Sequence, residues 1–318
     1  MINISFAPIQ VKNARWRRRQ LLQLLAFVAA LSRFIWSHSS DARSTFHANG
    51  RLWVWIWMTN RYIGCLPRKD SACLRVNFGD VLMELDLSRL TDCLAYCFGL
   101  GESEIGYIFS RVCGQNDIVL DVGANIGTTA LFFAKQCVNG KVHAYEPSKS
   151  MIQVLKNNIE RNNIQNIEVH PYALSDKAET AWLKVETPNN PGSAHLTADA
   201  EGSPVDIYAL DENPPTTNRL DFVKIDVEGY EMKVLKGGQQ LFRSHKPMIV
   251  LEINFYALER MQTAASDVYR LLTEWGYQLF ILEKGKLVEF LPVLKTPIVF
   301  NLIAIHCEKR PIASALLR

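Results

Sequence analysis

Cysteine is scarce in this sequence and shows no paired arrangement. The 318 residues include seven cysteines, an odd number, and no two of them form a Cys-x-x-Cys motif. Disulfide-dependent secreted domains carry paired cysteines at high density, and many structural zinc sites use Cys-x-x-Cys pairs. We therefore expect a reducing compartment and a cytoplasmic location, and the cysteines imply no zinc site.

Acidic residues are nearly absent from the first 69 residues. This segment holds eleven Lys/Arg against one acid, Asp41, for a net charge of +10, whereas the remaining 249 residues hold 24 basic and 31 acidic residues, for −7. Five of the seven tryptophans lie in the same basic segment. This shift in composition predicts a basic, Trp-rich extension at residues 1–72, a hairpin and helical part at 73–116, and the main domain at 117–318.

The extension also lacks an apolar run long enough to span a membrane. Its uncharged stretch Gln20–Ser32 has thirteen residues, whereas a spanning helix needs about 20. Three arginines precede the stretch, as in a signal peptide, but no clear cleavage site follows. Residues 12–36 instead suit a helix that either packs on its own domain or makes a peripheral contact with anionic lipid. Nucleic acid is not expected as a partner, because only this first quarter of the chain is basic.

The rest of the chain alternates short apolar strands with helical segments. Gly79-Asp80 separates Leu74–Phe78 from Val81–Leu87, which is typical of a hairpin. Further elements are expected at Glu102–Val112, Ile118–Val122, Thr128–Cys137, Lys141–Tyr145, Lys149–Asn162, Ile167–Ala173, Phe222–Val227, Glu231–Ser244, Met248–Ile253, Ala264–Trp275, Tyr277–Leu282 and Ile298–Ile305. This order predicts an α/β fold, a mostly parallel sheet with helices on both faces.

One internal segment has the composition of a loop. Residues Pro188–Pro215 are rich in Asn, Pro, Gly, Ser and Ala, which favours irregular structure. His195 lies in this segment and could act as a base toward an acceptor, but a solvated loop histidine is the simpler interpretation.

The first strand-to-helix turn of the main domain carries the strongest chemical signal. Asp121-Val-Gly-Ala-Asn-Ile-Gly127 follows a strand and opens a helix, and its glycines let the backbone turn sharply and approach a ligand. Glu146 follows the next strand, where a carboxylate can accept hydrogen bonds from both ribose hydroxyls. A nucleoside cofactor is therefore expected at this edge of the sheet.

The same residues distinguish between cofactors. The dinucleotide fingerprint places a second glycine where this chain has Asn125, so NAD is disfavoured. Asp121 would oppose a diphosphate, whereas a carboxylate suits the ammonium and sulfonium charges of S-adenosylmethionine. Methyl transfer is therefore favoured over hydride transfer.

A series of motifs carries a specific resemblance. In order, they are Asp121-Val-Gly-Ala-Asn-Ile-Gly127, Glu146-Pro147, Asn157-Asn158, Ala173-Leu-Ser-Asp176, Lys224-Ile-Asp-Val-Glu-Gly-Tyr-Glu231, Val234-Leu-Lys-Gly237 and Val250-Leu-Glu252. Over roughly residues 74–255 the chain resembles FkbM-type methyltransferases. The resemblance implies a class I, Rossmann-like fold with a seven-stranded sheet whose last strand is antiparallel. It also implies S-adenosylmethionine as methyl donor and hydroxyl acceptors on saccharides or other secondary metabolites.

The resemblance also assigns roles to individual residues. The predicted cofactor-binding residues are Asp121, Gly123, Ala124, Asn125, Gly127, Glu146, Ala173 and Asp176. Gly123–Gly127 are expected around the amino-acid part of the donor, and Ala173 with Ser175 or Asp176 beside the adenine. The predicted catalytic residues are Lys224, Asp226 and Glu228, which face the transferred methyl group.

A hydroxyl acceptor must lose its proton, so a carboxylate or a metal ion near the point of attack would help. Asp226 and Glu228 are the candidates for the base, although Glu228 could equally cap the next helix. Asp226, Glu252 and Asn254 offer oxygen ligands of the kind that suits Mg²⁺, while helix capping explains Asn254 equally well.

We therefore predict an S-adenosylmethionine-dependent O-methyltransferase that acts on a glycan, a glycolipid or a secondary metabolite. Two alternatives stay open. One is a membrane-surface adaptor that keeps the fold without catalysis, and the other is a nicotinamide-dependent oxidoreductase.

Overall fold

The computed structural model describes residues 73–78, 80–86, 89, 92, 95–96, 103–184, 194–197, 202–292 and 299–309. The basic extension, including residues 12–36, lies outside these ranges, so its contact with lipid stays a prediction. No helix within the described ranges is long and apolar enough to cross a membrane. The chain divides into two units, one with the hairpin and one that starts at Glu104, and each is described by itself.

The hairpin consists of β1 (Cys73–Phe78) and β2 (Val81–Asp86), which pair in antiparallel orientation. Alternate side chains of β2 are buried, at Val81, Met83 and Leu85. This alternation is the pattern of a strand with one face on a core. The predicted hairpin is confirmed.

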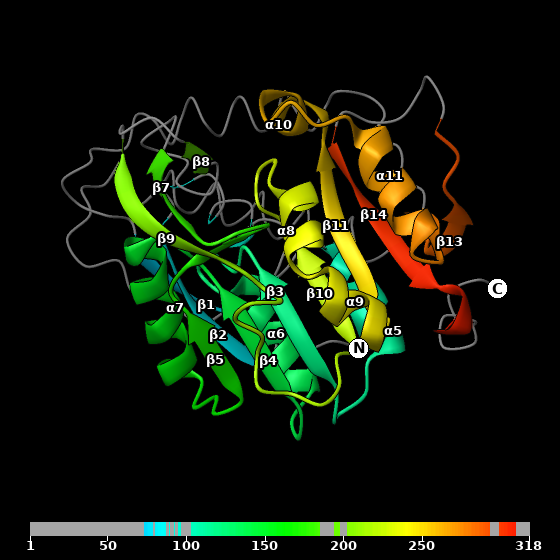
Figure 1. The fold of residues 1–318 in the computed structure, drawn as a ribbon. Coiled ribbons are helices and arrows are strands. Elements are labelled where there is room, and N and C mark those ends of the chain that lie inside the picture. The colour runs from blue at the N-terminus through cyan, green and yellow to red at the C-terminus, as the bar shows by residue number, and fades with distance from the viewer. Residues whose placement is uncertain are drawn as a thin grey trace, which may run out of the picture. The chain divides into compact units, whose positions relative to one another are not determined.

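The second unit is built on an eight-stranded sheet in the order β13-β12-β14-β11-β10-β3-β4-β5 (Figure 1). Its strands are β3 (Ile118–Val122), β4 (Lys141–Tyr145), β5 (Ile167–His170), β10 (Phe222–Ile225), β11 (Met248–Asn254), β12 (Tyr277–Glu283), β13 (Lys286–Glu289) and β14 (Val299–His306). The helices are α5 (Ser103–Val112), α6 (Thr128–Gln136), α7 (Lys149–Arg161), α8 (Glu231–Gly237), α9 (Gln239–His245), α10 (Phe255–Arg260) and α11 (Ala265–Glu274).

The last strand, β14, runs antiparallel between β11 and β12, as predicted. The predicted count of seven strands is wrong by one, because β13 turns back along β12 through Lys284-Gly285. Both turn residues have positive φ, 50° and 79°, which is the geometry of a two-residue hairpin turn.

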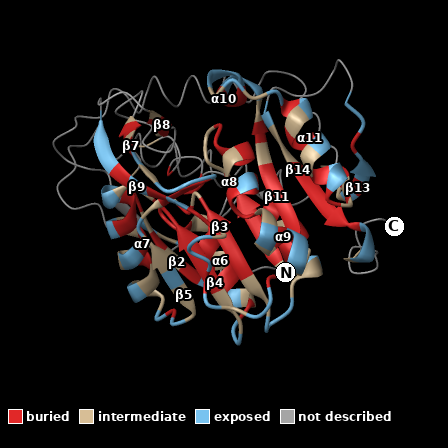
Figure 2. Ribbon diagram, viewed as in Figure 1, coloured by how far each residue is buried: buried red, intermediate tan, exposed pale blue. Residues whose placement is uncertain are grey.

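Helices cover both faces of this sheet, which confirms the predicted α/β architecture. On one face, Val234 of α8, Phe242 of α9 and Val268 of α11 share a buried apolar cluster with the strands. On the other face, the Phe109 ring of α5 lies 4.2 Å from that of Phe133 on α6. Figure 2 shows the central strands β3, β10 and β11 as buried. Burial on both faces explains why these strands are mostly apolar, with polar residues such as Asp121 and Lys224 near their carboxyl ends.

A second, four-stranded sheet has the order β6-β9-β7-β8 and corrects the prediction of a loop at Pro188–Pro215. Its strands are β6 (Ala173–Ser175), β7 (Glu179–Lys184), β8 (His195–Thr197) and β9 (Ser203–Ala209). In β9 every second residue from Val205 onward is buried, a strand signal that the local Gly, Pro and Ser content obscured. His195 is 8% exposed and pairs with β7, so its interpretation as a solvated loop histidine is wrong.

Two predicted elements are each split in two. Ile167–Ala173 divides into β5 and β6, which belong to different sheets, because Pro171 between them has no N–H to donate to a ladder. Glu231–Ser244 divides into α8 and α9 at Gly238. The carboxylate of Asp211 accepts hydrogen bonds from Gln240 and Leu241 N–H and so caps the second helix.

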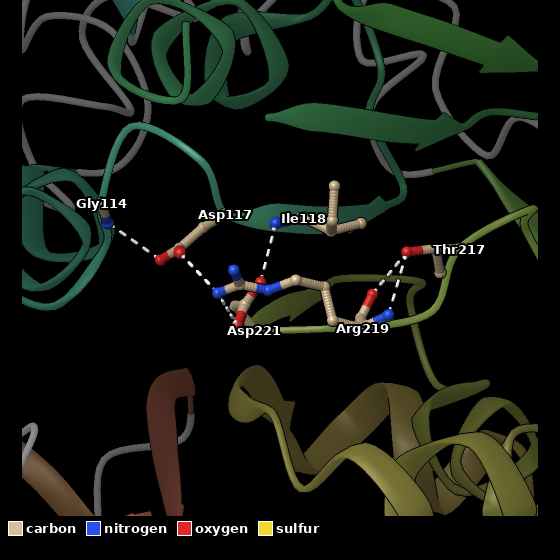
Figure 3. A network of polar contacts seen from close by, with 6 residues as sticks. All are labelled: Gly114, Asp117, Ile118, Thr217, Arg219 and Asp221. Carbon is tan, nitrogen blue, oxygen red and sulfur yellow. Dashed lines mark hydrogen bonds and ion pairs between the residues drawn. The ribbon is translucent and has the colours of Figure 1, made fainter. Parts of the chain in front are cut away.

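A polar network fixes the amino-terminal ends of β3 and β10 (Figure 3). Asp221 accepts a hydrogen bond from Ile118 N–H at 2.9 Å, and Arg219 donates to Asp221 at 2.7 Å and to Asp117 at 3.0 Å. The aligned starts of these parallel strands bring their carboxyl ends to one edge, where the predicted site residues lie.

Candidate functional site

The glycine turn after β3 is tied to the end of β4. Gly123 and Ala124 both donate their N–H to the Tyr145 carbonyl oxygen at 3.0 Å. Gly123 and Gly127 have φ of 85° and 91°, values at which glycine pays no steric penalty. Asn125, between them, has a φ of 51°, in the left-handed region that asparagine adopts more often than most other residues. The turn therefore forms a tight platform at the carboxyl edge of the sheet, as the sequence predicted.

Gly123 also touches the loop after β10. A Cβ at Gly123 would lie 1.8 Å from the Asp226 carbonyl oxygen. Asp226 N–H in turn donates to the Val122 carbonyl oxygen at 3.0 Å. The turn that carries the predicted cofactor residues and the loop that carries the predicted catalytic carboxylates are thus in direct backbone contact.

We expect Gly123→Ala to lower the free energy of unfolding by about 1–3 kcal/mol or more, since about 1–3 kcal/mol is the usual cost of such backbone strain alone. The added methyl group must push the Asp226 backbone away while the residue keeps a positive φ. Urea denaturation measures the loss. Gly114→Ala is the matched control, because its Cβ would meet no atom closer than 3.8 Å. Equal stabilities of the two variants would contradict the close contact.

Glu146 joins the turn to the segment that follows β4. One carboxylate oxygen accepts from Asn125 N–H at 2.9 Å and the other from Ser148 N–H at 2.8 Å. The residue is 7% exposed, and burial raises its pKa from 4.5 to about 7. Each carboxylate oxygen has a second lone pair, so both can still accept a hydrogen bond from a ligand.

This raised pKa predicts a pH dependence of stability. The folded protein holds the Glu146 proton more tightly than the unfolded chain does, so the stabilising contribution is complete at low pH and is lost as the pH rises through 7. The free energy of unfolding, relative to Glu146→Gln, should fall by about 1–3 kcal/mol between about pH 5 and pH 8. Glu231, whose pKa is also about 7, is present in both proteins and cancels. A difference that does not change with pH would contradict the raised pKa.

Lys224 lies between two carboxylates. Its Nζ is 3.6 Å from Asp121 Oδ1 and 3.3 Å from Asp226 Oδ2, and the residue is 4% exposed. Asp121 is fully buried, and its other oxygen accepts a hydrogen bond from the Thr129 hydroxyl at 2.7 Å. The structure thus brings Asp121, Gly123, Lys224 and Asp226 together. Lys224 links the ends of β3 and β10, a contact that favours a positioning role.

The loop after Asp226 is strained and tightly held. Glu228 has a φ of 50°, and its carbonyl oxygen accepts a hydrogen bond from Arg260 at 3.0 Å. Glu231, 1% exposed, accepts from Gly229 N–H at 3.1 Å and from Val227 N–H at 3.3 Å. In the sequence, Glu231 stands out only as the last residue of the motif that begins at Lys224. Its buried side chain braces the loop that carries both predicted catalytic carboxylates.

Four other predicted site residues make contacts of their own. The Asn254 side chain accepts from Ala257 N–H at 3.3 Å and caps α10, as the alternative interpretation expected. Ala173 packs in the apolar cluster of the second sheet. Asp176 is exposed and accepts a hydrogen bond from the Ser175 hydroxyl at 3.1 Å. Glu252 lies in β11 opposite Asn301 of β14.

The comparison with protein families decides between the candidate interpretations. Residues 121–279, half of the chain, match the family model described as the methyltransferase FkbM domain. The chain belongs to the FkbM methyltransferase family. The match begins at Asp121 and includes the glycine turn, Glu146 and the Lys224–Glu231 loop.

Several curated relatives of this FkbM-family chain are methyltransferases. It is 23% identical over 147 residues to methyltransferase 1 of Beauveria bassiana, covering 39% of this chain and 59% of the relative. It is 29% identical over 158 residues to methyltransferase sdnD of Sordaria araneosa, covering 39% and 61%. With the hexuronic acid methyltransferase AglP of Haloferax volcanii it shares 26% identity over 177 residues, covering 55% and 69%. The chain therefore spans about three fifths of the length of the first two relatives.

A cavity of about 680 Å³ lies beside α10 and α11 in this FkbM-family structure. Phe255, Tyr269 and Phe290 contribute aromatic rings to its wall, and none of the predicted site residues lines it. The Tyr269 hydroxyl is buried without a hydrogen-bond partner among the described residues. No local sequence pattern predicts this cavity, because its walls come from two separate segments, residues 255–269 and 290–292.

Proposed function

We propose that this chain transfers a methyl group from S-adenosylmethionine to a hydroxyl of a glycan, a glycolipid or a secondary metabolite. The observation that carries the proposal is the position of Glu146. Its carboxylate is held by backbone N–H groups of the glycine turn and of Ser148, at the edge where α/β sheets bind nucleosides. The hexuronic acid methyltransferase among the relatives supports a saccharide acceptor.

The residues present fit the proposed cofactor. Asn125 Oδ1 is a buried acceptor without a hydrogen-bond partner among the described residues, and such a group is costly unless a ligand satisfies it. Gly123–Gly127 would hold the amino-acid part and Glu146 the ribose hydroxyls, with Ala173 and Asp176 proposed beside the adenine. The bound cofactor supplies an electrophilic methyl group. Asp121 and Asp226 together carry one more charge than the Lys224 ammonium between them neutralises, and this excess negative charge suits the net positive charge of S-adenosylmethionine.

Asp226 is the proposed base. Its side chain is 26% exposed, whereas that of Asp121 is fully buried, so Asp226 is the carboxylate of this pair that an acceptor hydroxyl can reach. Lys224 holds Asp226 Oδ2 at 3.3 Å and leaves Oδ1 to accept the hydroxyl proton. Positioning of the acceptor and removal of its proton are then the contributions of these side chains to the rate. Glu228, in the same loop, is the second candidate for the base.

The contacts do not favour the proposed Mg²⁺ site. Asn254 already accepts a helix-capping hydrogen bond, and the Lys224 ammonium already neutralises Asp226. A divalent cation at Asp226 would have to approach this ammonium, which electrostatic repulsion opposes. No step of the proposed reaction therefore uses a metal ion.

The proposal is tested by calorimetric titration of the purified full chain with S-adenosylmethionine and with its demethylated product. NADH serves as the control for the oxidoreductase alternative. Transfer of a labelled methyl group into fractionated lipids, glycans and small metabolites then identifies the acceptor. Folded protein that takes up neither nucleoside would refute the proposal, whereas binding without transfer into any fraction would favour the adaptor alternative.

A further inference from the structure

A cluster of two histidines and a glutamate lies on neighbouring strands of the large sheet, apart from the residues assigned to methyl transfer. His143 of β4 stands opposite Glu168 of β5, and His170 stands opposite Tyr145, in the parallel register of these strands. Residues two apart on a strand share a face, so the three side chains project to the same side. Their potential ligand atoms all lie within 4.8 Å of one another.

The spacing of these atoms suits a small metal ion. His143 Nδ1 and His170 Nε2 are 3.1 Å apart, and each nitrogen lies 3.9 Å from one oxygen of Glu168. Zinc bonds of about 2.0–2.2 Å to nitrogen and oxygen place tetrahedral ligands about 3.3 Å apart. The Glu168 oxygens are thus slightly too far from the two nitrogens for tetrahedral ligands. Because the Glu168 side chain is 46% exposed, its carboxylate can rotate to the shorter distance.

Surrounding side chains hold the His170 ring with Nε2 toward the cluster. The Tyr172 hydroxyl lies 3.3 Å from His170 Nδ1 and accepts a hydrogen bond from Asn213 at 2.8 Å. The Tyr145 ring stacks on His170 with centroids 4.4 Å apart and an interplanar angle of 13°. A hydrogen bond to the nitrogen that does not ligate, together with a packed ring, is the usual support of a metal-binding histidine.

Burial and charge give the cluster the properties of a ligand set. His143 has no exposed side-chain surface, His170 has 13%, and the exposed edge of Glu168 leaves a route for an ion. Lys141 pairs with the same Glu168 oxygen that faces His143, and an ion would compete with this exposed ammonium.

We propose that His143, Glu168 and His170 bind one divalent transition-metal ion of the zinc type. Two imidazoles and one carboxylate suit zinc, cobalt or nickel better than magnesium. Three protein ligands leave one coordination position open. The ion would tie β4 to β5 immediately before Glu146. This inference does not depend on methyl transfer, because it concerns a separate group of side chains and is read out by metal binding.

The test is titration of the purified, metal-stripped full chain with Co²⁺, followed by visible absorption, and then displacement by Zn²⁺. Wild type should bind one equivalent at this site, and His170→Gln and Glu168→Gln should each bind at least about tenfold more weakly. His245→Gln removes a histidine outside the cluster and should bind as wild type does. Lys141→Met should bind at least as tightly as wild type, since it removes the competing ammonium.

These variants keep the fully buried His143 intact, so that folding is maintained, and thermal unfolding of each metal-free variant confirms this. Equal affinities of His170→Gln and His245→Gln would overturn the proposal, as would absence of Co²⁺ binding to wild type. Weaker binding by Lys141→Met would place the ion elsewhere. None of these results bears on S-adenosylmethionine binding, so failure here and failure of the proposed function are distinguishable.

Discussion

Replacing Glu146 by alanine should weaken the binding of S-adenosylmethionine by about 100-fold or more. The substitution removes the acceptor proposed for both ribose hydroxyls, and hydrogen bonds to a charged group contribute about 1.5–3 kcal/mol each. It also frees Asn125 N–H, which Glu146 holds at 2.9 Å, and so loosens the glycine turn. Two lost interactions of this size correspond to about 3 kcal/mol or more, which is at least two orders of magnitude in the dissociation constant. Isothermal titration calorimetry measures the change.

The matched control for this experiment is Glu160→Ala, which removes an exposed glutamate from α7. This control should bind S-adenosylmethionine as wild type does. Urea denaturation of Glu146→Ala separates lost ligand contacts from global unfolding. If the folded variant binds within threefold of wild type, Glu146 does not hold the ribose.

The order of elements and the edge that carries the site could be predicted because both follow from local signals. The alternation of apolar strands with helices indicated β3, α6, β4 and α7 within one or two residues of their observed bounds. Parallel strands end at a common edge, so residues placed just after them, such as Asp121 and Asp226, were expected to meet. Lys224 bridges these two carboxylates in the structure.

Other features depend on pairings that no local pattern records. The second sheet joins β6 to β9, whose centres lie about 30 residues apart, and the sequence between them contains the proline- and glycine-rich segment that suggested a loop. The cluster of His143, Glu168 and His170 exists only because β4 and β5 pair in one register. A shift by one residue would turn the β5 side chains to the opposite face.

Packing adds contacts of Lys224 that the motif alone did not predict. The resemblance predicts that Lys224 faces the transferred methyl group, which stays a prediction, and the structure shows its ammonium buried between Asp121, Asp226 and the Gly123 carbonyl oxygen. A buried cation between two carboxylates neutralises one of them and fixes both, since an unpaired buried charge is costly. Asp226 is left as the accessible carboxylate of this group.

Replacing Asp226 by asparagine should therefore lower kcat by about 100-fold or more, the usual contribution of a positioned general base. Asparagine keeps the size of the side chain and can still accept a hydrogen bond from Lys224, 3.3 Å away in the wild type, but its amide cannot take up the acceptor proton. The dissociation constant for S-adenosylmethionine should change only severalfold, because the glycine turn and Glu146 are intact. Transfer of labelled methyl to the acceptor measures kcat, and calorimetry measures binding.

The outcome of this substitution distinguishes a base from a structural residue. A residue that only supports the turn would, when replaced, weaken cofactor binding and stability along with turnover, since the Asp226 side chain holds Lys224, whose ammonium also contacts the Gly123 carbonyl oxygen. A base would change turnover alone, which is a loss of transition-state stabilisation. Asp267→Asn, a change at a half-buried residue in the first turn of α11, should leave both quantities unaltered. If Asp226→Asn retains a third or more of the wild-type kcat, proton removal belongs to another group, and Glu228→Gln then tests the remaining carboxylate of the loop.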